Sequence, residues 1–158
     1  MVSTSGARLI DESAVGALQD SLLPLALVAT PNIPEAEVLA DIKIASEADM
    51  EKAAEIMFQR YGCAVLVKGG HRVNDANDFL FSHDGGTWLY GTHVENPNTH
   101  GTGCTLSSAI AANLAKGLPL EQAVEKAKRY VSSCLSAQLN LGKGNGPMNH
   151  AFAIEGDY

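Results

Sequence analysis

Two short, unbroken apolar runs constrain the fold of this chain most strongly: residues 25–29, between Pro24 and Pro31, and residues 64–67. Such runs are typical of strands buried on both faces, as in parallel sheets covered by helices. Segments with helical periodicity surround them, at residues 11–22, 34–39, 46–61, 103–116 and 119–140. Buried strands that alternate with helices predict a layered α/β sheet with right-handed crossovers, in one domain over residues 1–158.

Helix ends are marked by capping residues and glycines. Asp11 is placed to cap the first helix, and Ser46 with Asp49 has the spacing of a capping box. Gly62 and Gly117 stand where helices commonly end. On the helix between Ser46 and Gly62, the apolar positions 50, 53, 54, 57 and 61 form one face, which we expect to point into the core.

A hairpin is predicted between residues 78–81 and 87–90. Both segments are strand-like, and His83-Asp84-Gly85-Gly86 lies between them. Glycine after a polar pair is typical of tight turns. We therefore expect an antiparallel hairpin at the edge of the sheet.

Composition excludes several classes of protein. With 158 residues, 46% of them hydrophobic and 18% charged, the chain has the composition of a folded globular protein. A formal charge of −7 disfavours nucleic acid and anionic membranes as partners, so phosphate must be held by a local site. No apolar run could span a bilayer, and the three cysteines lack zinc spacing. We expect a cytoplasmic protein without a nucleic-acid or membrane partner.

The segment from His100 to Cys104 carries the clearest chemical signal. Gly101, Thr102 and Gly103 immediately precede or begin a helix with little charge. Glycines let consecutive amides point at one place, and the helix start adds partial positive charge, which together predict an anion hole. The same field favours thiolate at Cys104, which could take a proton from a substrate hydroxyl. The alternative is tight helix packing with Cys104 as a small buried residue.

Two further loops follow the apolar runs. Asn32 and Glu35 come after residues 25–29, and Lys68 follows residues 64–67. Because ligands bind at the carboxyl ends of parallel strands, Asn32 and Glu35 are placed to hold magnesium-bound water, and Lys68 to contact nucleotide phosphates. The alternatives are a turn amide with a helix-start acid, and a solvated lysine.

The remaining candidate side chains indicate structural roles. We expect His83 and His93 to lie on surface loops, whereas His150 lies in the C-terminal tail beside Asn149, and no histidine pair has helical metal spacing. The expected packing residues are Cys63, Cys134 and Trp88.

Four segments carry a family resemblance: TPNIPEAEVL, VLVKGGH, ENPNTHGTGCTLSSAIAANLAKG and GKGNGPMNH. They resemble the hydroxymethylpyrimidine/phosphomethylpyrimidine kinases of thiamine biosynthesis, within the ribokinase-like superfamily. The resemblance implies a three-layer, mostly parallel sheet flanked by helices. It also implies ATP-dependent phosphorylation, with Mg²⁺, of 4-amino-5-hydroxymethyl-2-methylpyrimidine and then of its monophosphate.

Site roles follow from the resemblance position by position. Gly101, Thr102 and Gly103 look like the anion hole, and Cys104 looks like the base or proton relay. The pair Asn32 and Glu35 looks like the family's element for magnesium and phosphate, with Glu35 acting through water, and Lys68 looks like a nucleotide contact.

The resemblance begins within the family's usual length. Residues 1–3 resemble the segment just after an Asp-Pro-Val strand end, so the portion that supplies most pyrimidine contacts is expected to be missing here. A sheet edge and an apolar face would then need cover. We therefore expect this chain to form a homo-oligomer or to be part of a longer one.

Other functions remain open at this point. A pyridoxal-type kinase of the same superfamily is the nearest alternative, and a non-catalytic nucleotide-binding remnant is another. A cysteine hydrolase using Cys104 and His100 ranks last, because no orienting acid or amide can be assigned.

Overall fold

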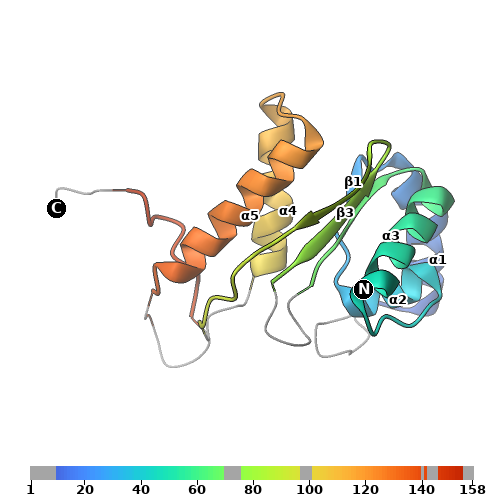
Figure 1. The fold of residues 1–158 in the computed structure, drawn as a ribbon, viewed down its shortest axis with the longest axis horizontal. Helices are drawn as coiled ribbons and strands as arrows, with labels where there is room; N and C mark the ends of the chain where they lie inside the picture. The colour runs from blue at the N-terminus through green and yellow to red at the C-terminus, as the bar shows by residue number, and fades with distance from the viewer. Residues whose placement is uncertain (1–9, 70–75, 97–100, 140, 142–145, 155–158) are drawn as a thin grey trace. The chain divides into compact units, whose positions relative to one another are not determined.

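The computed structural model describes residues 10–69, 76–96, 101–139, 141 and 146–154 (Figure 1). The chain divides into two compact units, Met1–His93 and Val94–Tyr158, which are described separately. Single-domain organisation over residues 1–158 stays a prediction. Among the described residues, no helix is both long and apolar enough to cross a membrane.

The first unit contains a four-stranded sheet in the order β1-β2-β3-β4. Its strands are β1 (Val28–Ala29), β2 (Ala64–Val67), β3 (Asp78–Ser82) and β4 (Gly85–Leu89). The pairing of β1 with β2 is parallel, whereas β2 with β3 and β3 with β4 pair antiparallel. The α/β class and the hairpin are confirmed. The described sheet is mixed rather than mostly parallel, because the hairpin supplies two of its three pairings.

The first predicted strand is shorter than its apolar run. Residues 25–29 were expected to be extended, but only Val28–Ala29 pair, and Leu25 ends a 3-10 turn that contains Pro24. The φ that proline fixes fits such a turn, and proline has no N–H to donate to a neighbouring strand. The prediction that both faces of this run are buried is therefore wrong, since Leu25 is exposed. The same prediction is confirmed for β2, where all four residues are buried.

Three helices accompany the sheet: α1 (Glu12–Ala17), α2 (Ile33–Ala40) and α3 (Glu47–Tyr61). After α1 the chain continues through a π-helical turn, Leu18–Leu22, into the 3-10 turn. The capping box of α3 is confirmed, with Ser46 Oγ accepting from Asp49 N at 3.3 Å and Asp49 Oδ2 accepting from Ser46 N at 3.0 Å. Asp11 holds the N-cap position of α1 but its side chain caps nothing, which corrects that expectation.

The core of this unit lies between the sheet and helices α2 and α3, which lie side by side (Figure 1). The predicted inward face of α3 is confirmed: Met50, Ala53, Ala54, Met57 and Tyr61 are all buried. They pack in one cluster with Val65 and Val67 of β2 and with Phe79 of β3. Arg60 and Tyr61 both donate to the main-chain oxygen of Leu39, at 2.8 and 2.9 Å, and so join the end of α2 to α3.

The second unit is built on two helices, α4 (Thr102–Ala115) and α5 (Leu120–Ser136), packed against each other. Leu106 and Ile110 of α4 are buried, as is a row on α5: Ala123, Val124, Ala127 and Cys134. Helix α5 ends earlier than the predicted residue 140, and Gln138 has a positive φ of 35°. Beyond it, Asn149 N donates to Cys134 O at 3.2 Å and attaches the tail to α5.

Candidate active site

In the first unit, Asn32 and Lys68 meet just beyond the carboxyl ends of β1 and β2. They form a parallel bridge, and Lys68 N donates to Pro31 O at 2.9 Å. The Lys68 ammonium donates to Thr30 O at 2.6 Å. The expectation that these loops share one edge of the sheet is thus met. Lys68 is only partly exposed and held by main chain, so it is not a freely solvated lysine.

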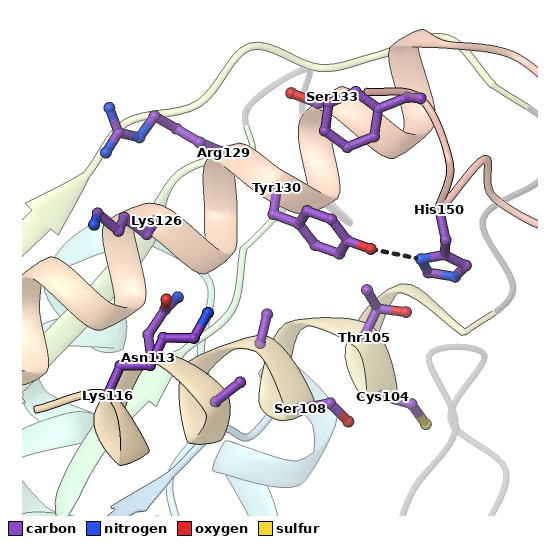
Figure 2. A pocket seen from close by; sticks show the side chains of 13 residues that line it. Cys104, Thr105, Ser108, Asn113, Lys116, Lys126, Arg129, Tyr130, Ser133 and His150 are labelled. Atoms are coloured by element: carbon purple, nitrogen blue, oxygen red, sulfur yellow. Dashed lines mark hydrogen bonds between the residues drawn. The ribbon is translucent and has the colours of Figure 1, made fainter. Parts of the chain in front are cut away.

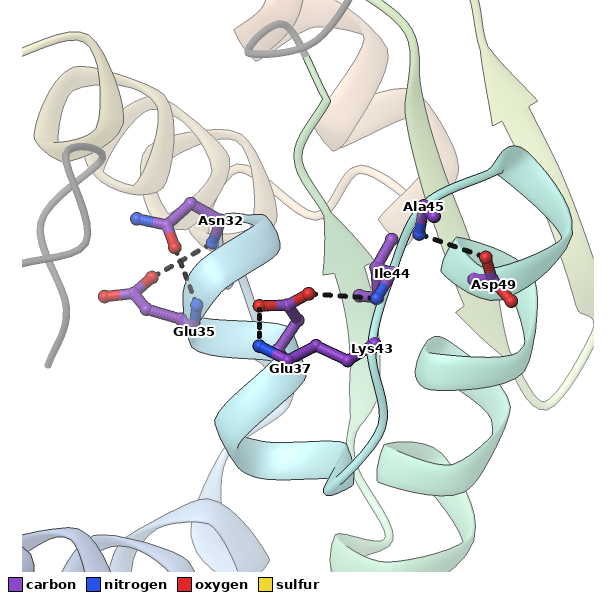
Figure 3. A network of polar contacts seen from close by, with 7 residues as sticks. All are labelled: Asn32, Glu35, Glu37, Lys43, Ile44, Ala45 and Asp49. Atoms are coloured by element: carbon purple, nitrogen blue, oxygen red, sulfur yellow. Dashed lines mark hydrogen bonds and ion pairs between the residues drawn. The ribbon is translucent and has the colours of Figure 1, made fainter.

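Asn32 and Glu35 form a capping box at the start of α2 (Figure 3). Asn32 Oδ1 accepts from Glu35 N at 2.8 Å, and Glu35 Oε2 accepts from Asn32 N at 3.0 Å. Both side chains therefore have a structural role of the kind expected at a helix start. Their role toward magnesium or phosphate stays a prediction. The box holds both groups at the carboxyl edge of the sheet, in a fixed orientation.

Glu37, two residues further along α2, has a different role (Figure 3). Its Oε1 accepts from Ile44 N at 3.0 Å, and its Oε2 lies 3.3 Å from Lys43 Nζ. These contacts fix the connection between α2 and α3. The Glu37 carboxylate therefore has a structural role.

Gly69 follows Lys68, and glycine is required there because the main chain of Asn77 lies too close to leave room for a side chain. A Cβ at this position would overlap the main-chain oxygen of Asn77. Gly69 N also donates to Asp78 Oδ1 at 2.9 Å, which joins the end of β2 to the start of β3. The close approach that requires glycine at position 69 is therefore made by Asn77 of the same chain. Gly70 and His71 lie outside the described residues.

In the second unit, the predicted anion hole lies at the start of α4. Gly101 is the N-cap, with φ at 86°, a left-handed conformation that favours glycine. No side chain caps this end among the described residues, and Thr102 and Gly103 form the first turn. The first amides of a helix have no partner within the helix and carry partial positive charge. His100 lies outside the described residues.

Cys104 is the third residue of α4 and its side chain is exposed. The alternative of a small buried cysteine is therefore wrong for Cys104. The prediction that Cys63 and Cys134 are packing residues is confirmed, since both are buried. Burial raises the pKa of each thiol.

Cys104 also lines a pocket of about 820 Å³ within the second unit (Figure 2). The wall along α4 consists mainly of small side chains, and α5 contributes Lys126, Arg129, Tyr130 and Ser133. His150 and Phe152 of the tail complete it. No carboxylate lines the described pocket, so its charged side chains are all cationic.

His150 is a pocket residue that the sequence places only in the tail, beside Asn149. It is exposed, and its Nδ1 lies 3.2 Å from Tyr130 Oη (Figure 2). The same nitrogen lies 3.8 Å from Cys134 Sγ. Burial, and then the neighbouring Cys134, raises the pKa of Tyr130. No spacing in the sequence indicates this contact, because the tail turns back on α5.

Magnesium fits the first unit only in an open coordination. Among the described residues, no group of three or more histidine, cysteine or carboxylate side chains could enclose a metal. Mg²⁺ commonly keeps several waters and takes one or two carboxylates together with substrate phosphates. Glu35 offers one such carboxylate, so the donor set suits a phosphate-bound Mg²⁺.

Known proteins match this chain along nearly all of its length. The family model described as phosphomethylpyrimidine kinase matches residues 1–149. A hydroxymethylpyrimidine/phosphomethylpyrimidine kinase of Rhizobium meliloti is 49% identical over 95% of this chain and 58% of its own length. The thiamine biosynthesis bifunctional protein ThiED of Geobacter sulfurreducens is 44% identical, over 98% of this chain and 32% of its own.

Solved structures agree with the fold. Bacillus subtilis pyridoxal kinase, in an ADP complex, has a TM-score of 0.85 at 31% identity, over 96% of this chain and 58% of its own. Phosphomethylpyrimidine kinase of Clostridium difficile has a TM-score of 0.72 at 39% identity, over 84% of this chain and 53% of its own. The chain thus spans little more than half of the single-function relatives. Matched along residues 1–149 and carrying the glycine loop with its exposed thiol, it belongs to the phosphomethylpyrimidine kinase family.

Proposed function

We propose that this chain carries the phosphate-binding and base elements of an ATP-dependent kinase that acts on 4-amino-5-hydroxymethyl-2-methylpyrimidine and then on its monophosphate. The observation that carries the proposal is the exposed Cys104 thiol in the first turn of α4, directly after the left-handed Gly101. Membership of the family supports the substrate class.

The anion hole acts on the phosphoryl group in transfer. Main-chain amides of Gly101, Thr102 and Gly103, with the start of α4, stabilise negative charge on the γ-phosphoryl oxygens. Because phosphoryl transfer depends mainly on positioning and charge neutralisation, such amides supply much of the catalysis. No side-chain cap among the described residues competes for them.

Cys104 acts on the substrate hydroxyl. Its thiolate accepts the hydroxyl proton while the hydroxyl oxygen bonds to the γ-phosphorus. The bond from that phosphorus to the bridging β-γ oxygen breaks, and ADP leaves with the electron pair. The thiol then returns its proton to solvent, which restores the base for the second phosphorylation.

Asn32, Glu35 and Lys68 act on the nucleotide. Glu35 would hold Mg²⁺ through water, and the metal would neutralise phosphate charge. Asn32 orients the Glu35 carboxylate through the capping box. The Lys68 ammonium, held at Thr30 O, provides a cation for nucleotide phosphates. A cytoplasmic location and a homo-oligomeric state stay predictions.

A direct test is ATP consumption by the purified chain when the hydroxymethylpyrimidine is added with Mg²⁺. The proposal expects ADP and the phosphorylated pyrimidine in equal amounts, lost in Cys104→Ala. ATP binding without turnover would favour a non-catalytic remnant, which the partial span of the relatives makes a specific alternative. Acylation of Cys104 without nucleotide would indicate a hydrolase.

A pyridoxal-type kinase is the second candidate, favoured by the TM-score of 0.85 to the Bacillus subtilis pyridoxal kinase. The same assay distinguishes it, with pyridoxal and the hydroxymethylpyrimidine as competing substrates. The first proposal expects a higher kcat/KM for the pyrimidine. A clear preference for pyridoxal would assign the chain to the second activity.

A further inference from the structure

Residues 148–152 of the tail turn back onto α5 and form part of the pocket in the second unit. His150 and Phe152 line this pocket, which Cys104 also lines (Figure 2). Met148 is only 3% exposed, so the first residue of the segment is anchored within the unit. His150 and Phe152, in contrast, are both exposed. We call residues 148–152 the tail strap.

A side-chain hydrogen bond closes the tail strap onto α5. Tyr130 Oη and His150 Nδ1 lie 3.2 Å apart. Burial raises the pKa of Tyr130, so its hydroxyl keeps its proton and donates, and a neutral imidazole with its proton on Nε2 accepts at Nδ1. The ring of Tyr130 also lies 6.1 Å from that of His150 and 5.8 Å from that of Phe152. Tyr130 is therefore the residue of α5 on which the exposed part of the strap rests.

Protonation of His150 would remove the acceptor from this hydrogen bond. Histidine is the side chain that ordinarily changes charge between about pH 5 and 8, and an imidazolium donates from both nitrogens. No carboxylate lines the described pocket to stabilise an imidazolium. The charged and titratable groups near His150 are Tyr130, Cys134, Lys126 and Arg129 on α5, and Cys104 and Lys116 on α4. Three of them are cations, which disfavour a further positive charge.

We propose that the tail strap is a pH-sensitive cover of the pocket beside Cys104, closed while His150 is neutral and released from Tyr130 when His150 is protonated. Release takes His150 and Phe152 out of the pocket wall, so the pocket is more open in acid. The buried Met148 limits the motion to the residues beyond it. The proposal goes beyond the kinase function and is independent of it, since the strap requires no nucleotide.

Cys134 provides a measurement of the strap that does not depend on activity. Its side chain is fully buried and its Sγ lies 3.8 Å from His150 Nδ1, so release of His150 should uncover it. Cys63 is the matched control, because it is also buried but belongs to the first unit. Labelling by N-ethylmaleimide is read for each cysteine by mass spectrometry. The ratio of Cys134 to Cys63 labelling corrects for the general effect of pH on buried thiols.

The ratio is compared at about pH 8 and about pH 5.5 in a Cys104→Ser background, which removes the thiolate that would stabilise an imidazolium. The lower pH is expected to raise the ratio about threefold to tenfold, as for the loss of one hydrogen bond. His150→Asn keeps an acceptor near the position of Nδ1 but does not titrate, so its ratio should not change. A ratio independent of pH with His150 present, or one that rises equally in His150→Asn, overturns the proposal.

Tyr130→Phe tests the other partner of the hydrogen bond in the same background. It removes the hydroxyl but keeps the ring that contacts His150 and Phe152. Its ratio at about pH 8 should already equal that of the background at about pH 5.5, and it should change little with pH. A ratio as low as that of the background at about pH 8, with the same rise in acid, overturns the assignment of Tyr130 and with it the proposal.

Discussion

The two units hold their candidate groups in different ways. In the first, Asn32, Glu35 and Lys68 are all engaged by main-chain groups, through a capping box and a lysine held on a carbonyl. In the second, Cys104 is exposed at the start of a helix that no described side chain caps. The groups of the first unit have a structural role in addition to any role in ligand binding. The exposed Cys104 thiol, in contrast, can take part in chemistry without contributing to stability. Substitution of the candidate groups in the first unit should therefore change both stability and ligand binding. Substitution of Cys104 in the second unit should change activity with little change in stability.

The largest effect is expected from Cys104→Ala. As the proposed base, Cys104 should contribute about 100-fold or more to kcat, while its exposed side chain should contribute little to thermal stability. The measurement is ATP-dependent phosphate transfer, together with thermal unfolding. Ser108→Ala, at an exposed residue lining the same pocket, should leave both unchanged. Full turnover in Cys104→Ala would remove the thiol from the mechanism.

Gly69→Ala should show the opposite pattern, a loss of stability. Its Cβ would overlap the main-chain oxygen of Asn77, and overpacking of this kind costs about 1–3 kcal/mol. Gly16→Ala is the matched control, because nothing lies within 4 Å of its Cβ position and alanine is the better helix former there, by up to about 1 kcal/mol. Urea unfolding compares the two. Equal stability of both variants would contradict the close approach.

Asn32→Ala tests whether the capping pair also serves a ligand. Loss of an N-cap costs about 1 kcal/mol, and Ser46→Ala removes the equivalent cap of α3 at similar cost. Only Asn32→Ala should also weaken ATP affinity, measured by calorimetry at a temperature where both variants are folded. If both variants bind ATP as the unchanged chain does, Asn32 has a structural role alone.

The smallest effect concerns the pH dependence of the α3 cap. The hydrogen bond from Ser46 to Asp49, with those from the Ala45 and Ser46 amides, lowers the pKa of Asp49 below 3.8. A lowered pKa contributes stability above the unfolded value and loses it as pH falls through the folded value. Ser46→Ala should move the Asp49 pKa back toward 3.8, as measured by carboxyl NMR titration. An unchanged pKa would contradict the assigned cause.

Local signals explain why α3 could be predicted from sequence almost residue by residue. Its capping box, inward face and terminal glycine lie within one continuous segment, so each depends on near neighbours alone. The run at residues 25–29 could not be predicted as well, because an apolar run gives no information on where a turn at Pro24 ends and a strand begins.

The candidate site was predictable in part for a similar reason. The glycine loop and Cys104 form one short motif, and their position at the start of α4 follows from it. Asn32 and Glu35 remain ambiguous because a capping box and a magnesium site require the same residue types. The contact of His150 with Tyr130 was missed, since it depends on a tail that returns to α5.

The most direct test of the proposed anion hole is an NMR titration with Mg²⁺-ATP, following the amides of Gly101, Thr102 and Gly103. We expect these amides to shift and saturate with ATP and to stay unchanged with adenosine, which has the same base but no phosphates. ATP binding that saturates elsewhere while these three amides do not move would contradict the assignment of this helix start as the phosphate site.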